Sequence, residues 1–243
     1  MGRIIKMDLY RLRTSKSFWV SLIIVFLTGA LLSISPLFFS KDYSVTLTEI
    51  IGMPIDDVII TVLYISVSIF CYADLSNGFI KNIAGQIPKK GLTAASKFIV
   101  IIFHNLIFFA VGFLAKLVGS IPFLTFAGNY LYAFTYLLMR FLLVLAMCTM
   151  ILFATTALRS KTFGTVLGVM FGVGGFSLIY MMLDTMIQNF YKGLKLEDYS
   201  PSSINPSTIN TAADGFRVFA VGIVFTVVFL ILSIKVVNKR DVK

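Results

Sequence analysis

Six long apolar segments, separated by short loops that carry the charges, constrain the fold of this chain more than any other feature of its sequence. An α-helix rises 1.5 Å per residue, so a stretch of about 20 apolar residues can cross the hydrocarbon core of a bilayer. The sequence therefore predicts an all-α integral membrane protein with a single transmembrane domain, 1–243. The six predicted transmembrane helices lie at about residues 18–39, 57–73, 98–119, 130–158, 163–187 and 215–236.

The composition leaves no room for a separate soluble catalytic domain. Hydrophobic residues make up 58% of the chain and charged residues 13%, whereas soluble domains usually carry about 25% charged residues. A net charge of +10 is compatible with nucleic-acid binding, but the basic residues flank apolar segments and form no patch interleaved with aromatic residues. We therefore expect no nucleic-acid partner and no enzymatic activity in this chain.

Lysine and arginine are distributed unevenly between alternate loops. Fifteen of the 21 basic residues lie in the two terminal segments and in the loops that share their side, whereas five lie in the opposite loops. Short loops rich in lysine and arginine stay in the cytoplasm. Both termini are therefore predicted to be cytoplasmic.

The segment before the first apolar run has the pattern of an amphipathic helix. Ile5, Leu9 and Leu12 fall on one helical stripe, and the neighbouring basic side chains point away from it. A helix of this kind lies along a membrane surface with its apolar face in the lipid. Residues 1–17 are therefore predicted to form a cytoplasmic surface helix, and the alternative is a simple basic flank of the first span.

The loop between the second and third spans carries a second amphipathic pattern. Leu75, Phe79 and Ile83 recur every four residues, so a short helix here would present an apolar ridge to the cytoplasm. A soluble protein that docked on this ridge would bury Phe79 as an anchor, as interface hot spots usually do. The alternative is a loop that folds back on its own bundle.

This loop and the predicted topology resemble those of a known family. The motif acidic-x-x-Asn-Gly-x-Ile-Lys-Asn runs from Asp74 to Asn82. Together with the basic surface helix and the six spans, it is similar to the permease subunits of type-2 ATP-binding-cassette exporters, although many members carry Glu where this chain has Asp74. The resemblance implies that residues 74–84 form a coupling helix in a cleft of an ATPase subunit. The residues with this implied role are Asp74, Leu75, Asn77, Gly78, Phe79, Ile80, Lys81, Asn82 and Ile83.

The same resemblance implies partners and a function. Two cytoplasmic ATP-binding-cassette ATPase subunits would bind Mg-ATP, this chain would hold no cofactor, and a second identical or similar permease would complete the complex in a bacterial plasma membrane. Small permeases of this family often serve peptide export and immunity, so we expect export of an amphipathic or antimicrobial peptide. The alternative is a secondary transporter or channel without an ATPase, which requires ionisable residues near the bilayer centre and broken helices in paired positions.

Glycines four residues apart make a flat groove on the fifth predicted helix. Gly164, Gly168 and Gly172 form this stripe, and such a groove lets another helix backbone approach closely. The approaching helix belongs either to the same chain or to a second permease. The resemblance implies that the first and fifth helices line a permease interface, and so it favours the second permease.

Arg140 is the one charged residue well within an apolar segment. Placing arginine in the bilayer costs about 2.5–3.5 kcal/mol on insertion scales, so the side chain should face protein or water. Asp184 is predicted at a similar depth and is the expected partner, either in a structural ion pair or in a translocation path that contacts the substrate. Lys116 is expected to extend to the outer membrane surface.

No residue pattern indicates a catalytic or metal site. His104 is the single histidine, and no cluster of His, Cys or carboxylates accompanies it in the sequence, whereas a metal site needs several ligands. Cys71 and Cys148 lie in apolar segments at different depths. This placement disfavours a disulfide and predicts two buried thiols.

Overall fold

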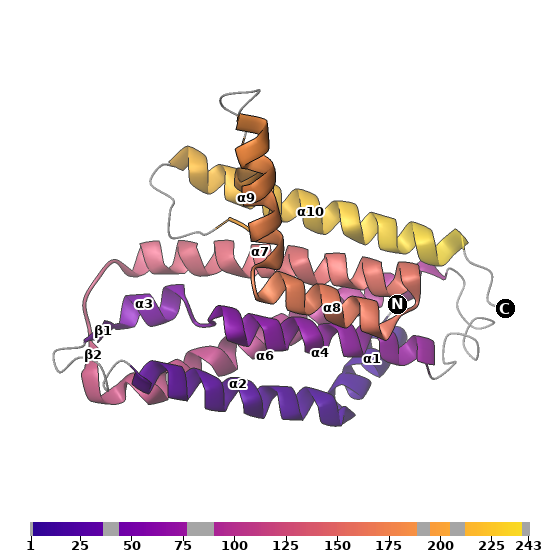
Figure 1. Ribbon diagram of the computed structural model, residues 1–243. Coiled ribbons are helices and arrows are strands. Elements are labelled where there is room, and N and C mark those ends of the chain that lie inside the picture. The colour runs from indigo at the N-terminus through magenta and orange to yellow at the C-terminus, as the bar shows by residue number, and fades with distance from the viewer. Residues whose placement is uncertain (1, 36–43, 77–89, 189–194, 205–211, 240–243) are drawn as a thin grey trace.

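The chain folds into a bundle of long helices that lie side by side (Figure 1). A computed structural model describes residues 2–35, 44–76, 90–188, 195–204 and 212–239. The α-helices are α1 (Gly2–Thr14), α2 (Lys16–Ile34), α3 (Leu47–Gly52), α4 (Asp57–Ser76), α6 (Gly91–Ser120), α7 (Tyr130–Leu158), α8 (Lys161–Gly172), α9 (Gly175–Gln188) and α10 (Ala212–Lys239). The shorter elements are the 3-10 helices η2 (Ile121–Phe123) and η3 (Leu196–Tyr199) and the parallel two-residue strands β1 (Val45–Thr46) and β2 (Leu124–Thr125).

Five stretches of the described chain are long and apolar enough to cross a membrane, and the bent pair α8 and α9 brings the number to six if it counts as one span. The predicted all-α, multi-pass membrane protein is thereby confirmed by the length and composition of the helices. The predicted bounds of the fourth span match α7, whereas α6 starts earlier than the third predicted span. The five stretches are Lys16–Ile34, Leu47–Ala73, Gly91–Phe123, Tyr130–Leu158 and Asp214–Lys239.

The helices differ in how much of their surface the bundle covers. In α7 and in the stretch Leu47–Ala73, 56% of the apolar window is buried, whereas in α10 the share is 22% and in α2 it is 28%. The exposed residues of the two peripheral helices are large and apolar, such as Leu31 and Val224. In a bilayer these side chains face lipid, so the exterior of the bundle is apolar because lipid is its solvent.

The second predicted span is longer than expected and is broken near its outer end. We predicted a helix over 57–73, but α3 precedes α4 and the two together make one apolar stretch with a break over 53–56. Pro54 lacks a backbone N–H, which interrupts a helix at this point. The break packs tightly on α6, because a Cβ atom at Gly112 would lie 2.7 Å from the carbonyl oxygen of Pro54.

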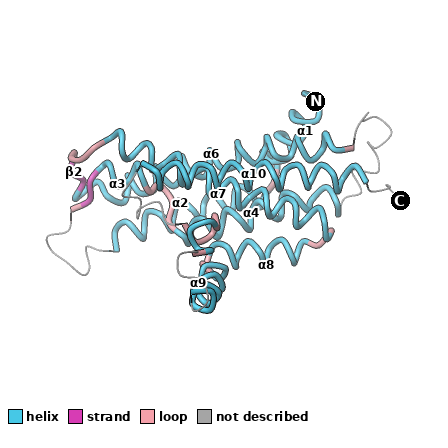
Figure 2. The backbone as a smooth tube through the Cα atoms, turned by 90° about the horizontal axis from the view of Figure 1, so that it is seen from above, coloured by secondary structure: helices cyan, strands magenta, loops and turns pink. Residues whose placement is uncertain are grey.

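The fifth predicted span is not one straight helix. We predicted a single helix over 163–187, whereas α8 and α9 meet at an angle of 66°. Gly174 at the joint has a φ of +75°, a left-handed conformation that glycine adopts without steric cost. Figures 1 and 2 show that α9 leaves the bundle almost at right angles to its long axis. The prediction of one continuous helix was therefore wrong.

Helix α1 has the amphipathic pattern that the sequence predicts, and it packs on α6. Leu12 is buried and Leu9 is partly buried, whereas Arg3 and Arg13 are exposed. The sequence gave no sign that Asp8 is also buried. Its carboxylate accepts a hydrogen bond of 2.6 Å from the hydroxyl of Ser96 in α6, which ties α1 to the start of that helix.

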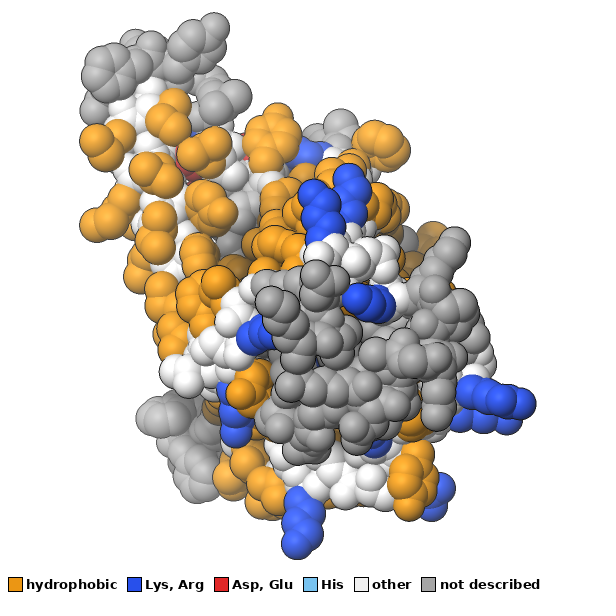
Figure 3. Space-filling model, turned by 90° about the vertical axis from the view of Figure 1, so that its right-hand side faces the viewer, with side chains coloured by type: hydrophobic (Ala, Val, Ile, Leu, Met, Phe, Trp, Pro, Cys, Tyr) orange, Lys and Arg blue, Asp and Glu red, His pale blue; other side chains and the backbone are white. Residues whose placement is uncertain are grey.

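Lysine and arginine side chains surround one end of the bundle (Figure 3). The ends of α4, α7 and α10 and the start of α8 lie here, next to α1 (Figure 1). Two contacts bring the start of α6 to the same end: the Gly91 N–H donates to Asn238 Oδ1 at 2.6 Å, and Lys97 Nζ donates to the Cys71 carbonyl at 2.7 Å. The strands β1 and β2 lie at the opposite end.

Candidate functional site

Two ion pairs flank the break between α3 and α4. On one side, Lys116 Nζ lies 2.6 Å from Asp56 Oδ1 and donates to the Met53 carbonyl at 2.7 Å. On the other side, Arg140 Nη2 lies 2.8 Å from Asp57 Oδ1. The break therefore brings four charged side chains from three helical segments together within one apolar stretch.

The contact of Lys116 with Met53 has a clear structural cause. A helix end leaves backbone carbonyls without partners, and a cation near the C-terminus of a helix is favourable. Within a bilayer each unsatisfied backbone group costs several kcal/mol. Lys116 has a side chain only 13% exposed and caps the end of α3, so the expectation that it extends to the outer membrane surface was wrong.

The predicted pairing of Arg140 with Asp184 was also wrong. Arg140 pairs with Asp57, whereas the carboxylate of Asp184 accepts hydrogen bonds from the Leu196 and Glu197 amides at 2.6 Å and 2.9 Å. The bend between α8 and α9 explains the difference, because it carries Asp184 away from α7. Asp184 instead holds the start of η3 against α9.

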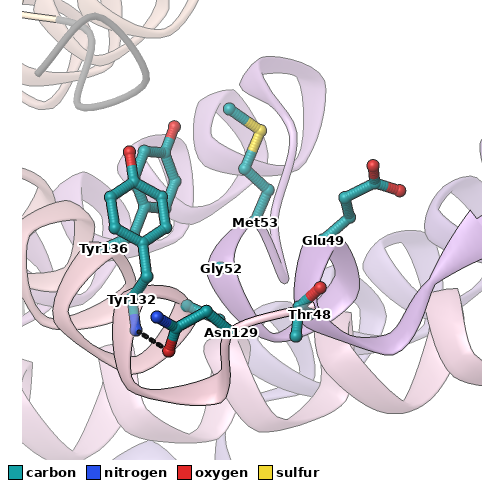
Figure 4. A pocket seen from close by; sticks show the side chains of 8 residues that line it. Thr48, Glu49, Gly52, Met53, Asn129, Tyr132 and Tyr136 are labelled. Carbon is teal, nitrogen blue, oxygen red and sulfur yellow. Dashed lines mark hydrogen bonds between the residues drawn. The ribbon is translucent and has the colours of Figure 1, made fainter. Parts of the chain in front are cut away.

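A pocket of about 340 Å³ opens beside α3 and the first turns of α7 (Figure 4). The rings of Tyr132 and Tyr136 form one side of it, and Met53 lies on the other. The Glu49 carboxylate at its edge already accepts the Thr46 N–H at 3.1 Å, as part of a capping box. Its lining residues are Thr48, Glu49, Gly52, Met53, Asn129, Tyr132, Ala133 and Tyr136.

Two smaller pockets border the ion pairs themselves. One, of about 230 Å³, lies beside Asp56 and Lys116, and the other, of about 60 Å³, lies beside Asp57, Tyr64 and Arg140. Charged groups next to open space can bind an ion or a polar group of a substrate. The break is therefore the best candidate for a polar binding site in the part of the chain that the structure describes.

His104 and the two cysteines are buried in the bundle. His104 Nε2 lies 3.1 Å from the Ser66 hydroxyl, and its ring packs edge-on against Phe18. Cys71 and Cys148 are buried free thiols, which confirms their predicted burial. Among the described residues, no group of three His, Cys, Asp or Glu side chains is arranged to hold a metal ion.

The glycine stripe of α8 packs against α4 of the same chain. A Cβ atom at Gly168 would lie 3.1 Å from Tyr64 Cβ, and one at Gly172 would lie 2.6 Å from Thr61 Cα. Gly164 faces Ser68 and Thr155 in the same way. Of the two arrangements that the sequence left open, the structure has the one within a single chain, because α4 already fills the groove that a second permease would need.

The predicted coupling segment falls mostly outside the described residues. Asp74 and Leu75 belong to the last turn of α4, and the structure describes nothing of the residues from Asn77 to Ile83. Helix α4 ends and helix α6 begins at the end of the bundle that is rich in lysine and arginine (Figure 3). The segment therefore starts and finishes at that end.

Comparison with known proteins adds no relative. No protein-family model matches this chain, and no curated protein is significantly similar to it. The resemblance to exporter permeases rests on the loop motif and on the arrangement of helices alone.

Proposed function

We propose that this chain is the membrane-spanning permease subunit of an ATP-driven exporter and that a separate cytoplasmic subunit hydrolyses the ATP. Two ATPase subunits bind Mg-ATP, and two permeases of this kind share the complex in a bacterial plasma membrane. The substrate that we propose is an amphipathic or antimicrobial peptide.

One observation carries the proposal. The segment with the exporter-like motif connects α4 to α6 at the end of the bundle where lysine and arginine gather (Figure 3). A lysine- and arginine-rich end is the cytoplasmic end of a membrane protein, and a cytoplasmic ATPase can reach it. The apolar exterior of the helices supports the membrane location.

The proposed mechanism uses the contacts at this end. Lys97 in α6 binds the carbonyl of Cys71 in α4, so the two helices that flank the motif are joined next to it. Closure of the ATPase would push on residues 74–84, and the joined helices would transmit the movement to the bundle. Such a complex alternates between two states, and ATP biases the balance between them.

Replacing the apolar anchor of the motif tests the proposal. We expect Phe79→Asp to abolish co-purification of the ATPase, because a charge in a desolvated pocket is costly. The control is Phe126→Asp, which places the same charge on a side chain that is 77% exposed at the opposite end. Phe126→Asp should leave the complex intact. Co-purification of the ATPase with Phe79→Asp at normal yield would refute the coupling assignment.

A second candidate function is secondary transport without an ATPase. The observation that favours it is the presence of two broken apolar stretches, α3 with α4 and α8 with α9, together with ion pairs at the first break. Secondary transporters bind substrate at broken helices and couple it to ions. This reading predicts transport driven by an ion gradient in vesicles that contain this chain alone.

A further inference from the structure

An apolar groove lies between α7, α8, α9 and α10. Its volume is about 450 Å³, which is within the range of about 300–1,000 Å³ that is typical of ligand sites. Methionine and aromatic side chains dominate its walls, and such side chains adapt to flexible apolar ligands. Walls from three helices are Met147, Met150, Phe153, Leu167, Phe225 and Phe229.

This groove adjoins the small polar pocket that contains Arg140. The two cavities share four wall residues, and the Phe171 ring is one of them. Phe171 packs on Phe176 of α9, with ring centroids 4.7 Å apart. A ligand that occupied both cavities would therefore have an apolar part in the groove and a polar part beside Arg140.

The charge of Arg140 defines the polar part. Its side chain is 14% exposed, and its Nε atom is buried with no hydrogen-bond partner among the described residues. The Asp57 side chain that it binds is 80% exposed, so replacing that contact costs little. A guanidinium binds phosphate in a two-pronged geometry, and a phosphate group could therefore take over Arg140.

We propose that the groove binds an acyl chain of an anionic membrane phospholipid whose phosphate group pairs with Arg140. The bilayer supplies this ligand at the groove itself, because α7, α8 and α10 belong to the apolar stretches. Arg140 is ten residues beyond the start of α7, about 15 Å along the helix. The phosphate of the bound lipid therefore lies deeper than that of bulk lipid. This site does not depend on the proposed ATPase partner.

Quenching by brominated lipids measures the site directly. A Trp19→Phe, Phe225→Trp chain carries a single tryptophan in the groove, and it is reconstituted in mixtures of dibrominated phosphatidylglycerol and phosphatidylcholine. We expect the groove to prefer phosphatidylglycerol by about tenfold, the size of one charge-assisted hydrogen-bonded contact. Arg140→Gln in this background should reduce the preference to about one, whereas Arg217→Gln, an arginine in an outer ion pair, should leave it unchanged.

Two further measurements separate the groove from its alternatives. Ala154→Phe fills the groove from a wall residue that is 7% exposed, and it should abolish the strong quenching component while Arg140 is intact. This variant tests the site even if Arg140→Gln fails to fold. Glycerol phosphate in solution should not compete with the lipid. Equal quenching by both lipids in the parent, an unchanged preference in Arg140→Gln, or competition by glycerol phosphate would each overturn the proposal.

Discussion

Lys116 and Arg140 each bring a positive charge to the break between α3 and α4, and each finds a carboxylate there. Lys116 also satisfies a backbone carbonyl that the break exposes. Charged side chains in apolar stretches are usually paired in this way, because the unpaired charge is costly. The two aspartates at the break are thus part of the bundle and do not belong to an outer loop.

Removing the Lys116 ammonium should destabilise the bundle. Lys116→Met leaves the Met53 carbonyl and the Asp56 carboxylate without this donor, and we expect a loss of about 2 kcal/mol in the free energy of unfolding. Thermal unfolding in detergent measures the loss, with the exposed Lys195→Met as control. Adding Asp56→Asn to Lys116→Met should restore part of the stability. An unchanged melting temperature of Lys116→Met would show that the cap contributes nothing.

The sequence indicated the charged residues but not their partners. Arg140 stands out because it interrupts an apolar run, and its need for a partner follows from solvation alone. Its pairing with Asp57 depends on the break that follows Gly52 and on the bend that removes Asp184, and both are tertiary features. Pro54 next to two aspartates was a usable signal, but it also fits the start of a loop.

At the scale of the elements, α4 and α8 form the closest pair that the sequence foresaw only in part. The glycine spacing predicted a close helix contact, but spacing cannot tell which helix fills the groove. The bend at Gly174 was not predicted, because apolar residues continue on both sides of it and give no periodic signal. The bounds of α7, by contrast, follow from an uninterrupted apolar run with Asn129 as its N-cap.

A crosslink between α4 and α8 tests their packing within one chain. Ser68 Oγ and Thr165 Oγ1 lie 3.4 Å apart, so cysteines at these positions are close enough for a disulfide. In a Cys71→Ala, Cys148→Ala background, oxidation of Ser68→Cys, Thr165→Cys should give a crosslinked monomer on a denaturing gel. Thr165→Cys alone is the control and should stay unlinked. A crosslinked dimer would assign this face to a second chain.

At the scale of the whole molecule, the basic end and the opposite end should lie on different sides of the membrane. We expect Phe126→Cys, in the same cysteine-free background, to react with an impermeant maleimide in intact cells. Lys239→Cys at the end of α10 should react only after the membrane is permeabilised. Labelling of Lys239→Cys in intact cells would reverse the proposed orientation and would put the exporter-like motif outside, where no ATPase can reach it.

The most direct test of the exporter proposal is the ATPase activity of the purified chain, measured alone and with the proteins encoded beside it. The proposal predicts no activity from the chain alone. It predicts activity with a nucleotide-binding partner, and loss of that partnership in Phe79→Asp. Absence of any co-purifying ATPase, with substrate transport driven by an ion gradient, would contradict the proposal and would favour secondary transport at the break between α3 and α4.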